Sequence, residues 1–197
     1  MTKLAAAAAA ILMAGAVAPA QTTYQIDSAH SAAEFSVRHL MVSNVRGQFS
    51  KVTGTVVYDS NNLAASKITA SIDATTVDTR EAKRDAHLKS PDFFDVAKYP
   101  VITFQSKEVT QAGGKLQVRG DLTMHGVTRE AVLAVETSPE IKDPYGMQRR
   151  GATATTKINR KDWGLTWNKA LETGGVVVGD EVTITLDIEC VHKPAGN

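Results

Sequence analysis

The chain has 197 residues, of which 22 are lysine or arginine and 21 are aspartate or glutamate, so its formal net charge at pH 7 is +1. This near balance argues against a protein that binds nucleic acid through the phosphate backbone, because such proteins concentrate basic side chains. Cys190 is the only cysteine, which excludes an internal disulfide and a cysteine cluster for zinc.

Residues 1–20 have the pattern of a secretory signal peptide. Lys3 is followed by an apolar run over residues 4–17 and by Ala18-Pro19-Ala20, a small-residue cleavage site. A membrane anchor is the alternative, but the run is too short to span a bilayer comfortably and precedes a cleavage pattern. We therefore expect a periplasmic protein, secreted through the signal peptide of residues 1–20, with no membrane span and one mature domain over residues 21–197.

Most of the mature chain alternates between apolar and polar residues, which is typical of β-strands with one buried face. Eight segments show this pattern: residues 30–39, 45–58, 66–74, 101–110, 115–125, 127–137, 150–160 and 180–191. The fold class is therefore all-β. An eight-stranded antiparallel barrel is favoured because closure removes the exposed edge strands, although a two-sheet sandwich fits the same alternation.

One clearly helical insert, at about residues 79–95, interrupts the strands. Asp78 is predicted to cap the helix, with Glu81 completing a capping box, and residues 80–89 contain no glycine and no β-branched residue. Pro91 disfavours helix at the preceding residue and ends it. Phe93 and Phe94 follow, so the insert is a natural aromatic plug for one end of a barrel.

At about eight strands, the interior of a barrel is either filled by side chains or holds one small ligand. The alternation assigns large apolar side chains to inward positions, namely Phe35, Phe49, Phe104, Leu122, Met124 and Ile158. A packed core is the simpler interpretation of these residues alone. Small residues at other inward positions favour a cavity, because larger side chains there would close it; they are Gly120, Ala131, Ala152 and Ala154.

Polar candidates are few. Arg80 and Arg84 share one side of the helix and could meet an anionic head group at an entrance, or could simply solvate the helix face. His39 shares the face of Phe35 and Val37, and a core histidine is the favoured interpretation.

Motifs for catalysis or metal binding are absent from the sequence. The five histidines show no helical i, i+4 zinc spacing, and there is no G-x-S-x-G elbow or P-loop. Asp27, His30 and Ser31 are close in sequence, but a catalytic triad requires a specific spatial geometry. The sequence therefore predicts no catalytic site, no metal site and no cofactor.

Several short motifs resemble, in order and spacing, those of the YceI-like lipid- and polyisoprenoid-binding proteins. They are Asp27-Ser28-Ala29-His30-Ser31, Phe35-x-Val37-x-His39-Leu40, Val45-x-Gly47-x-Phe49, Arg84-Asp85-x-His87-Leu88-x-Ser90-x-Asp92-Phe93-Phe94-Asp95, Tyr99-Pro100-x-Ile102-Thr103-Phe104, residues 120–128 and residues 159–164. The resemblance covers nearly all of residues 24–190. It implies a secreted, lipocalin-like antiparallel barrel that holds an isoprenoid or similar lipid chain.

We therefore expect a binding protein, not an enzyme, that carries or sequesters a long-chain isoprenoid of the quinone or polyprenyl phosphate type. Burial supplies the affinity, at about 0.8 kcal/mol for each CH₂ group. The expected lipid-contacting residues are Phe35, Val37, His39, Phe49, Phe93, Phe94, Phe104, Leu122, Met124, Ile158 and Trp163, with Arg80 and Arg84 near the head group.

Two alternatives stay open. One is a secreted enzyme that acts on a lipid-like substrate, and the other is a ligand-free barrel that acts through a protein partner at the connection containing Trp163 and Trp167. The sequence also leaves open whether the chain forms a homodimer.

Overall fold

The computed structural model describes residues 21–172 and 174–194. The expected signal peptide of residues 1–20 lies outside the described residues. The strands are β1 (Gln21–Ile26), β2 (Ala32–His39), β3 (Ser43–Phe49), β4 (Val52–Asp59), β5 (Lys67–Asp73), β6 (Val77–Asp78), β7 (Val101–Ala112), β8 (Lys115–Met124), β9 (Val127–Thr137), β10 (Ile141–Lys142), β11 (Gln148–Asn159) and β12 (Val178–His192). In this part of the chain, α1 (Ala82–Lys89) is the one α-helix.

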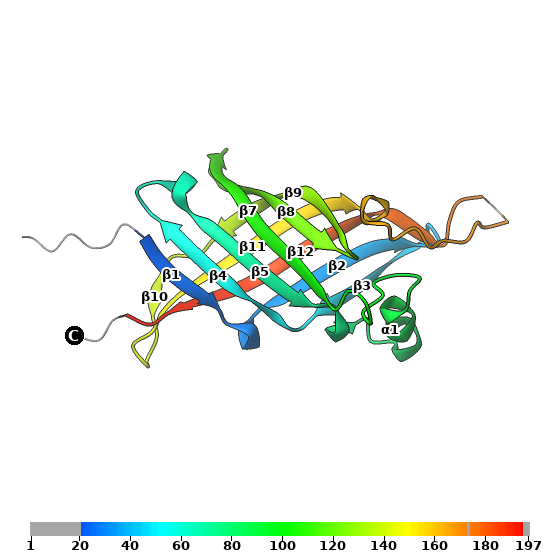
Figure 1. Cartoon of the computed structure of the whole chain (residues 1–197), viewed down its shortest axis with the longest axis horizontal. Coiled ribbons are helices and arrows are strands. Elements are labelled where there is room, and N and C mark those ends of the chain that lie inside the picture. Colours follow the sequence, from blue (N-terminus) through cyan, green and yellow to red (C-terminus); the bar gives the residue numbers. More distant parts are fainter. Residues whose placement is uncertain (1–20, 173, 195–197) are drawn as a thin grey trace, which may run out of the picture.

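The strands form a closed antiparallel barrel (Figure 1). Strands β1 and β2 form one bent path, since both pair with β12, and β3 with β4 form the next path, since they pair with β2 and β1. The eight paths are β1–β2, β3–β4, β5–β6, β7, β8, β9, β11 and β12. Each pairs with the next in sequence, and β12 pairs with both β11 and the first path. The predicted eight-stranded barrel is confirmed, and the two-sheet sandwich is excluded.

Strand β1 was missing from the predicted strands. Only two of its large side chains, those of Tyr24 and Ile26, face inward, and they follow the polar residues Gln21-Thr22-Thr23, so the apolar alternation is short. A 3₁₀ turn over Ser28–His30 separates it from β2, and the Asp27 side chain caps that turn by accepting from the Ala29 N–H at 3.1 Å. The first path therefore begins nine residues earlier than the sequence pattern indicated, at position 21 instead of 30.

Helix α1 ends at Lys89, before Pro91, as predicted, but its beginning differs from the prediction. Glu81 is the N-cap, and its carboxylate accepts from the Lys83 N–H at 3.2 Å. The predicted cap, Asp78, instead accepts from the Arg80 N–H at 2.7 Å. Arg80 has φ of 64°, a left-handed conformation that turns the chain sharply and delays the helix.

The helical insert lies at one end of the barrel, and the described C-terminal end of β12 lies at the other (Figure 1). Near the insert, buried apolar side chains form the larger core cluster, which includes Phe49, Val52, Phe93 and Trp163. A smaller cluster around Val109 and Val118 lies between β7, β8, β9 and β11. Within the described residues, no helix has the length and apolar character needed to cross a membrane.

Candidate functional site

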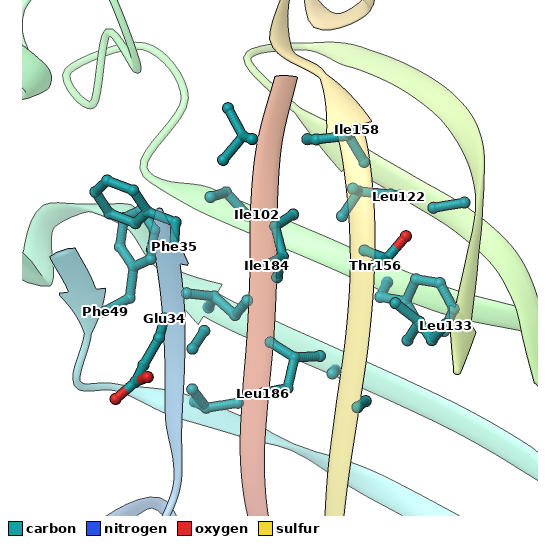
Figure 2. A pocket seen from close by; sticks show the side chains of 18 of the residues that line it. Glu34, Phe35, Phe49, Ile102, Leu122, Leu133, Thr156, Ile158, Ile184 and Leu186 are labelled. Atoms are coloured by element: carbon teal, nitrogen blue, oxygen red, sulfur yellow. The ribbon is translucent and has the colours of Figure 1, made fainter. Parts of the chain in front are cut away.

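A cavity of about 890 Å³ lies inside the barrel. Side chains from all eight strand paths line it, and Figure 2 shows Ile102, Leu122, Ile158, Ile184 and Leu186 directed toward one space. Its volume falls within the range of about 300–1,000 Å³ that is common for small-molecule sites. The interior is therefore not the fully packed core that the inward apolar residues alone suggested.

The structure brings together most of the side chains that the sequence analysis assigned to lipid contact. Ten of them line the cavity: Phe35, Val37, His39, Phe49, Phe93, Phe94, Phe104, Leu122, Met124 and Ile158. The positions of the eight on strands follow from the period of two, which directs alternate side chains inward, while Phe93 and Phe94 come from the helical insert. That they contact a lipid stays a prediction.

Trp163 is the exception, because it does not line the cavity. Its ring is buried in the neighbouring core, and its Nε1–H donates to the Leu122 carbonyl oxygen at 3.0 Å. Trp167, four residues later, lines the cavity instead and packs against His87 and Phe93, with ring centroids 4.8 Å and 5.2 Å away. Both tryptophans lie in the same connection between strands, and the sequence alone does not show which of them reaches the cavity.

The small inward residues act in two different ways. Ala131, Ala152 and Ala154 line the cavity, so their short side chains leave room in it as predicted. Gly120 does not line the cavity, because the Phe104 ring lies over it: a Cβ atom on Gly120 would be 2.6 Å from Phe104 Cζ. Its missing side chain is used for this close approach and not for cavity volume.

The aromatic end of the helical insert lines the cavity at the end of the barrel where α1 lies. Phe93 is buried, and the Phe94 ring meets the Phe49 ring edge-on at 5.4 Å. His87 of α1 meets Phe93 edge-on at 5.0 Å, and its Nε2 lies 2.9 Å from an Asp92 carboxylate oxygen. The insert therefore fits the expected position of a plug, with its rings packed on both the barrel and α1.

The two arginines predicted near a head group are not brought together at the cavity. Arg80 is exposed and does not line it. Arg84 lines it, but its guanidinium donates to Thr79, from Nε to the hydroxyl at 2.7 Å and from Nη2 to the carbonyl oxygen at 2.8 Å. Asp85 in turn accepts from the Thr79 N–H at 2.8 Å. Arg84 therefore fixes the turn before α1.

A polar group that the sequence analysis did not identify lies at the other end of the cavity, which we call the Arg150 end. It consists of Tyr24, Tyr58, Arg150 and Cys190, all of which line the cavity. The guanidinium of Arg150 stacks over the Tyr58 ring at 4.7 Å, and Tyr24 donates its hydroxyl proton to Glu140. The alternation could have predicted the inward position of Arg150, because Arg150 is on the same face of the strand as Ala152 and Ala154.

A group of side chains with metal-ligating atoms, Asp27, His30 and Glu189, lies near the same end of the barrel. A guanidinium already supplies its positive charge: Arg149 Nη1 lies 2.9 Å from Asp27 Oδ2 and also contacts Glu189. Hydrogen bonding to Arg149 holds the pKa of Asp27 below its usual range. The arrangement is an ion-pair network that fixes the chain, and we assign no metal to it.

The raised pKa values of Tyr24 and Cys190, at the Arg150 end, predict that the folded protein loses stability at alkaline pH. Burial, aided by the hydrogen bond to Glu140, raises the pKa of Tyr24 to about 12, and burial raises the pKa of Cys190 to about 11, from ordinary values of 10.0 and 9.0. Both groups keep their protons longer in the folded protein than in the unfolded chain. The unfolded chain therefore gains relative stability as pH rises through 9 and 10.

We expect the free energy of unfolding to be insensitive to these two groups below about pH 9 and to fall between pH 9 and pH 12. Denaturant titrations at a series of pH values measure it. Tyr24→Phe and Cys190→Ala should each flatten part of the decline. A wild-type profile with no decline over this window would contradict the prediction.

Comparison with known proteins agrees with this architecture. A protein of Staphylococcus aureus strain N315, UPF0312 protein SA2479, is 41% identical over 169 residues, which cover 85% of this chain and 96% of that protein. BcnA of Burkholderia cenocepacia has a similar crystal structure, with a TM-score of 0.73 at 23% identity, covering 83% of this chain and 98% of that one. A polyisoprenoid binding domain from Saccharophagus degradans superposes with a TM-score of 0.62 at 17% identity, covering 87% of this chain and 99% of that one.

These two structural likenesses are below 25% identity and show the fold alone. The family follows from the sequence itself. The profile of the YceI-like domain matches residues 24–190, which span the barrel from β1 into the end of β12. Together with the identity to the staphylococcal relative, this match shows that the chain belongs to the YceI-like family.

Proposed function

We propose that the protein binds one long apolar chain, of the isoprenoid type, inside the barrel and carries or sequesters it. The observation that supports this proposal is the cavity of about 890 Å³, whose wall is built mainly from aliphatic and aromatic side chains of every strand path. Such a wall provides few hydrogen-bonding groups for a small polar molecule, but it favours an apolar chain, because the chain leaves water when it enters the cavity.

Burial of the chain supplies the free energy of binding. Each sequestered CH₂ group contributes about 0.8 kcal/mol, so ten such groups contribute about 8 kcal/mol. Association and ordering of the chain oppose binding by an amount of similar size, about 4–15 kcal/mol. A chain well beyond ten carbons is therefore required for tight binding, which favours isoprenoid or long acyl lipids over short ones.

The Saccharophagus degradans domain is described as polyisoprenoid binding, and this description supports the isoprenoid class. A quinone tail and a polyprenyl phosphate both present such a chain. The signal-like pattern of residues 1–20 supports a periplasmic location, where the ligand would be taken from or given to a membrane.

The side chains of the cavity support binding more than catalysis. Cys190 lines the cavity, but burial raises the pKa of its thiol to about 11, which keeps it protonated and a poor nucleophile. The His87 imidazole is already paired with Asp92. A barrel that works through a protein partner alone would not need a cavity of this size.

Mass spectrometry tests the proposal directly. The protein is purified without detergent, its organic extract is analysed, and the intact species is weighed under native conditions. A stoichiometric isoprenoid or acyl lipid is the expected result. A ligand-free mass that stays unchanged after incubation with quinones and polyprenyl phosphates would refute the proposed function.

A further inference from the structure

We propose that the Arg150 end of the cavity is the site for an anionic lipid head group, a carboxylate or a phosphate, held by Arg150 while the apolar chain extends toward α1. This assignment rests on the proposed function and specifies the orientation and charge of its ligand.

Register across the strands places the polar side chains of this end together. Arg150 on β11 is the direct partner of Cys190 on β12, which in turn is the partner of Ile26 on β1. Directly opposed residues in an antiparallel pair have Cβ atoms about 4.5–5.5 Å apart. Tyr24 lies two residues before Ile26 and shares its inward parity. The arginine, the thiol and the phenol therefore converge on one end of the cavity.

Arg150 is the basic group of this end of the cavity, and one of its donors has no partner in the described part of the chain. It is half-buried and lines the cavity, and its Nε is buried without a hydrogen-bond partner among the described residues. A buried donor without a partner is costly, so a ligand oxygen there would stabilise the folded protein. The planar guanidinium presents two parallel donors that match a carboxylate or phosphate.

The neighbouring residue shows that carboxylates are not scarce near this strand. Arg149, which points the other way, contacts three of them: Asp27, Asp143 and Glu189. The ion pairs of this strand end belong to Arg149, whereas Arg150 stacks on the Tyr58 ring. The carboxylate at the Arg150 end, that of Glu140, accepts the Tyr24 hydroxyl proton. The stacking fixes the guanidinium plane, so Tyr58 acts as a positioning residue.

The arginines at the α1 end are, by contrast, committed to the protein. Arg38 donates to the Met41 carbonyl oxygen at 2.9 Å, and Arg84 to Thr79. Arg160 donates to the carbonyl oxygens of Leu165 and of residues 178 and 179. A head group at that end would have to break these bonds or pair with Lys83, which lines the cavity but is exposed to solvent. At the Arg150 end it would instead meet a half-buried arginine.

Three ligands with the same chain separate the head group from the tail: geranylgeranyl phosphate, geranylgeranoic acid and geranylgeraniol. Affinity is measured by isothermal titration calorimetry. Arg150→Gln is expected to weaken the binding of one or both anions by about 10- to 100-fold and to change the binding of the alcohol by less than about threefold. The ratio of the two anion effects tells whether the site prefers phosphate or carboxylate.

Lys157→Gln is the matched control, because Lys157 lies on the same strand but faces outward and pairs with Glu181 at 2.8 Å. It removes the same charge without touching the cavity. Equal loss of all three ligands in Arg150→Gln, or loss of the anions in Arg84→Gln instead, would overturn the assignment and leave the proposed function standing. If none of the three ligands binds the wild-type protein, both the head-group assignment and the proposed function are refuted.

A wild-type experiment protects the test against a variant that does not fold. A geranylgeranyl chain with a diazirine at its head is cross-linked to the protein and mapped by peptide mass spectrometry. Cross-links near Tyr24, Tyr58, Arg150 or Cys190 are expected. Cross-links confined to residues 81–94 or to His39 would place the head at the α1 end and overturn the assignment.

Discussion

Replacing Arg160 with leucine is expected to lower the free energy of unfolding by about 3–5 kcal/mol, since the change removes the side-chain donor to the Leu165 and Gly179 carbonyl oxygens and the guanidinium that pairs with Asp180. Arg160 is only 3% exposed, and its guanidinium donates to the Leu165 carbonyl oxygen, to that of Gly179 at 2.9 Å and to that of Val178 at 3.4 Å. Arg160 therefore connects the end of β11 to the start of β12, at residues 178 and 179, and to Leu165 in the segment between these strands.

Denaturant unfolding monitored by tryptophan fluorescence measures this loss. Lys161→Leu is the matched control, because Lys161 is adjacent and basic but exposed, and its ammonium group pairs with Asp180 at 2.8 Å. An exposed pair contributes at most about 1 kcal/mol. A loss at Arg160 no larger than that at Lys161 would show that the buried carbonyl groups find other partners.

Filling the cavity is expected to weaken lipid binding strongly without unfolding the barrel. Ala152 faces inward from β11 and lines the cavity. In Ala152→Phe the ring takes space that several CH₂ groups of the ligand need, and three displaced groups cost about 2–3 kcal/mol, or roughly 30- to 150-fold in affinity. Because the ring enters an existing space, the free energy of unfolding should stay the same or rise slightly.

Thr153→Phe provides the comparison, since Thr153 is exposed on the opposite face of the same strand and bonds to Asp187 at 3.0 Å. Calorimetry with geranylgeranyl ligands and thermal unfolding are run on both variants. Full affinity in Ala152→Phe would mean that the lipid lies outside the barrel. A folded Ala152→Phe protein that has lost its ligand would locate the lipid inside.

The barrel was predictable because a single physical rule, the period of two, acts along every strand and assigns the inner face correctly. It failed where a segment is short or polar, as in Gln21-Thr22-Thr23 at the start of β1. It also gives Arg150 an inward position, but the sequence analysis did not identify Arg150 because a charged residue at a strand end is ordinarily solvent-exposed.

The remaining parts of the site depend on contacts between segments without a repeat. Trp163 and Trp167 lie in one connection, and only the packing of His87 and Phe93 decides which of them reaches the cavity. Arg84 appeared available for a ligand because its partner, Thr79, approaches it through the left-handed turn at Arg80. Such a backbone conformation is rare for arginine and cannot be predicted from local propensity.

The pairing of the last strand with the first path has a consequence for how the molecule folds. Every other contact between strand paths joins neighbours in sequence, but β12 must find β1 and β2 across almost the whole described chain. Closing so large a loop carries the main entropic cost and makes this step slow. Until residues 178–192 dock, the sheet is open, with two unpaired edge strands and an apolar inner face exposed to water. The cavity therefore becomes enclosed only when the fifteen residues of β12 dock.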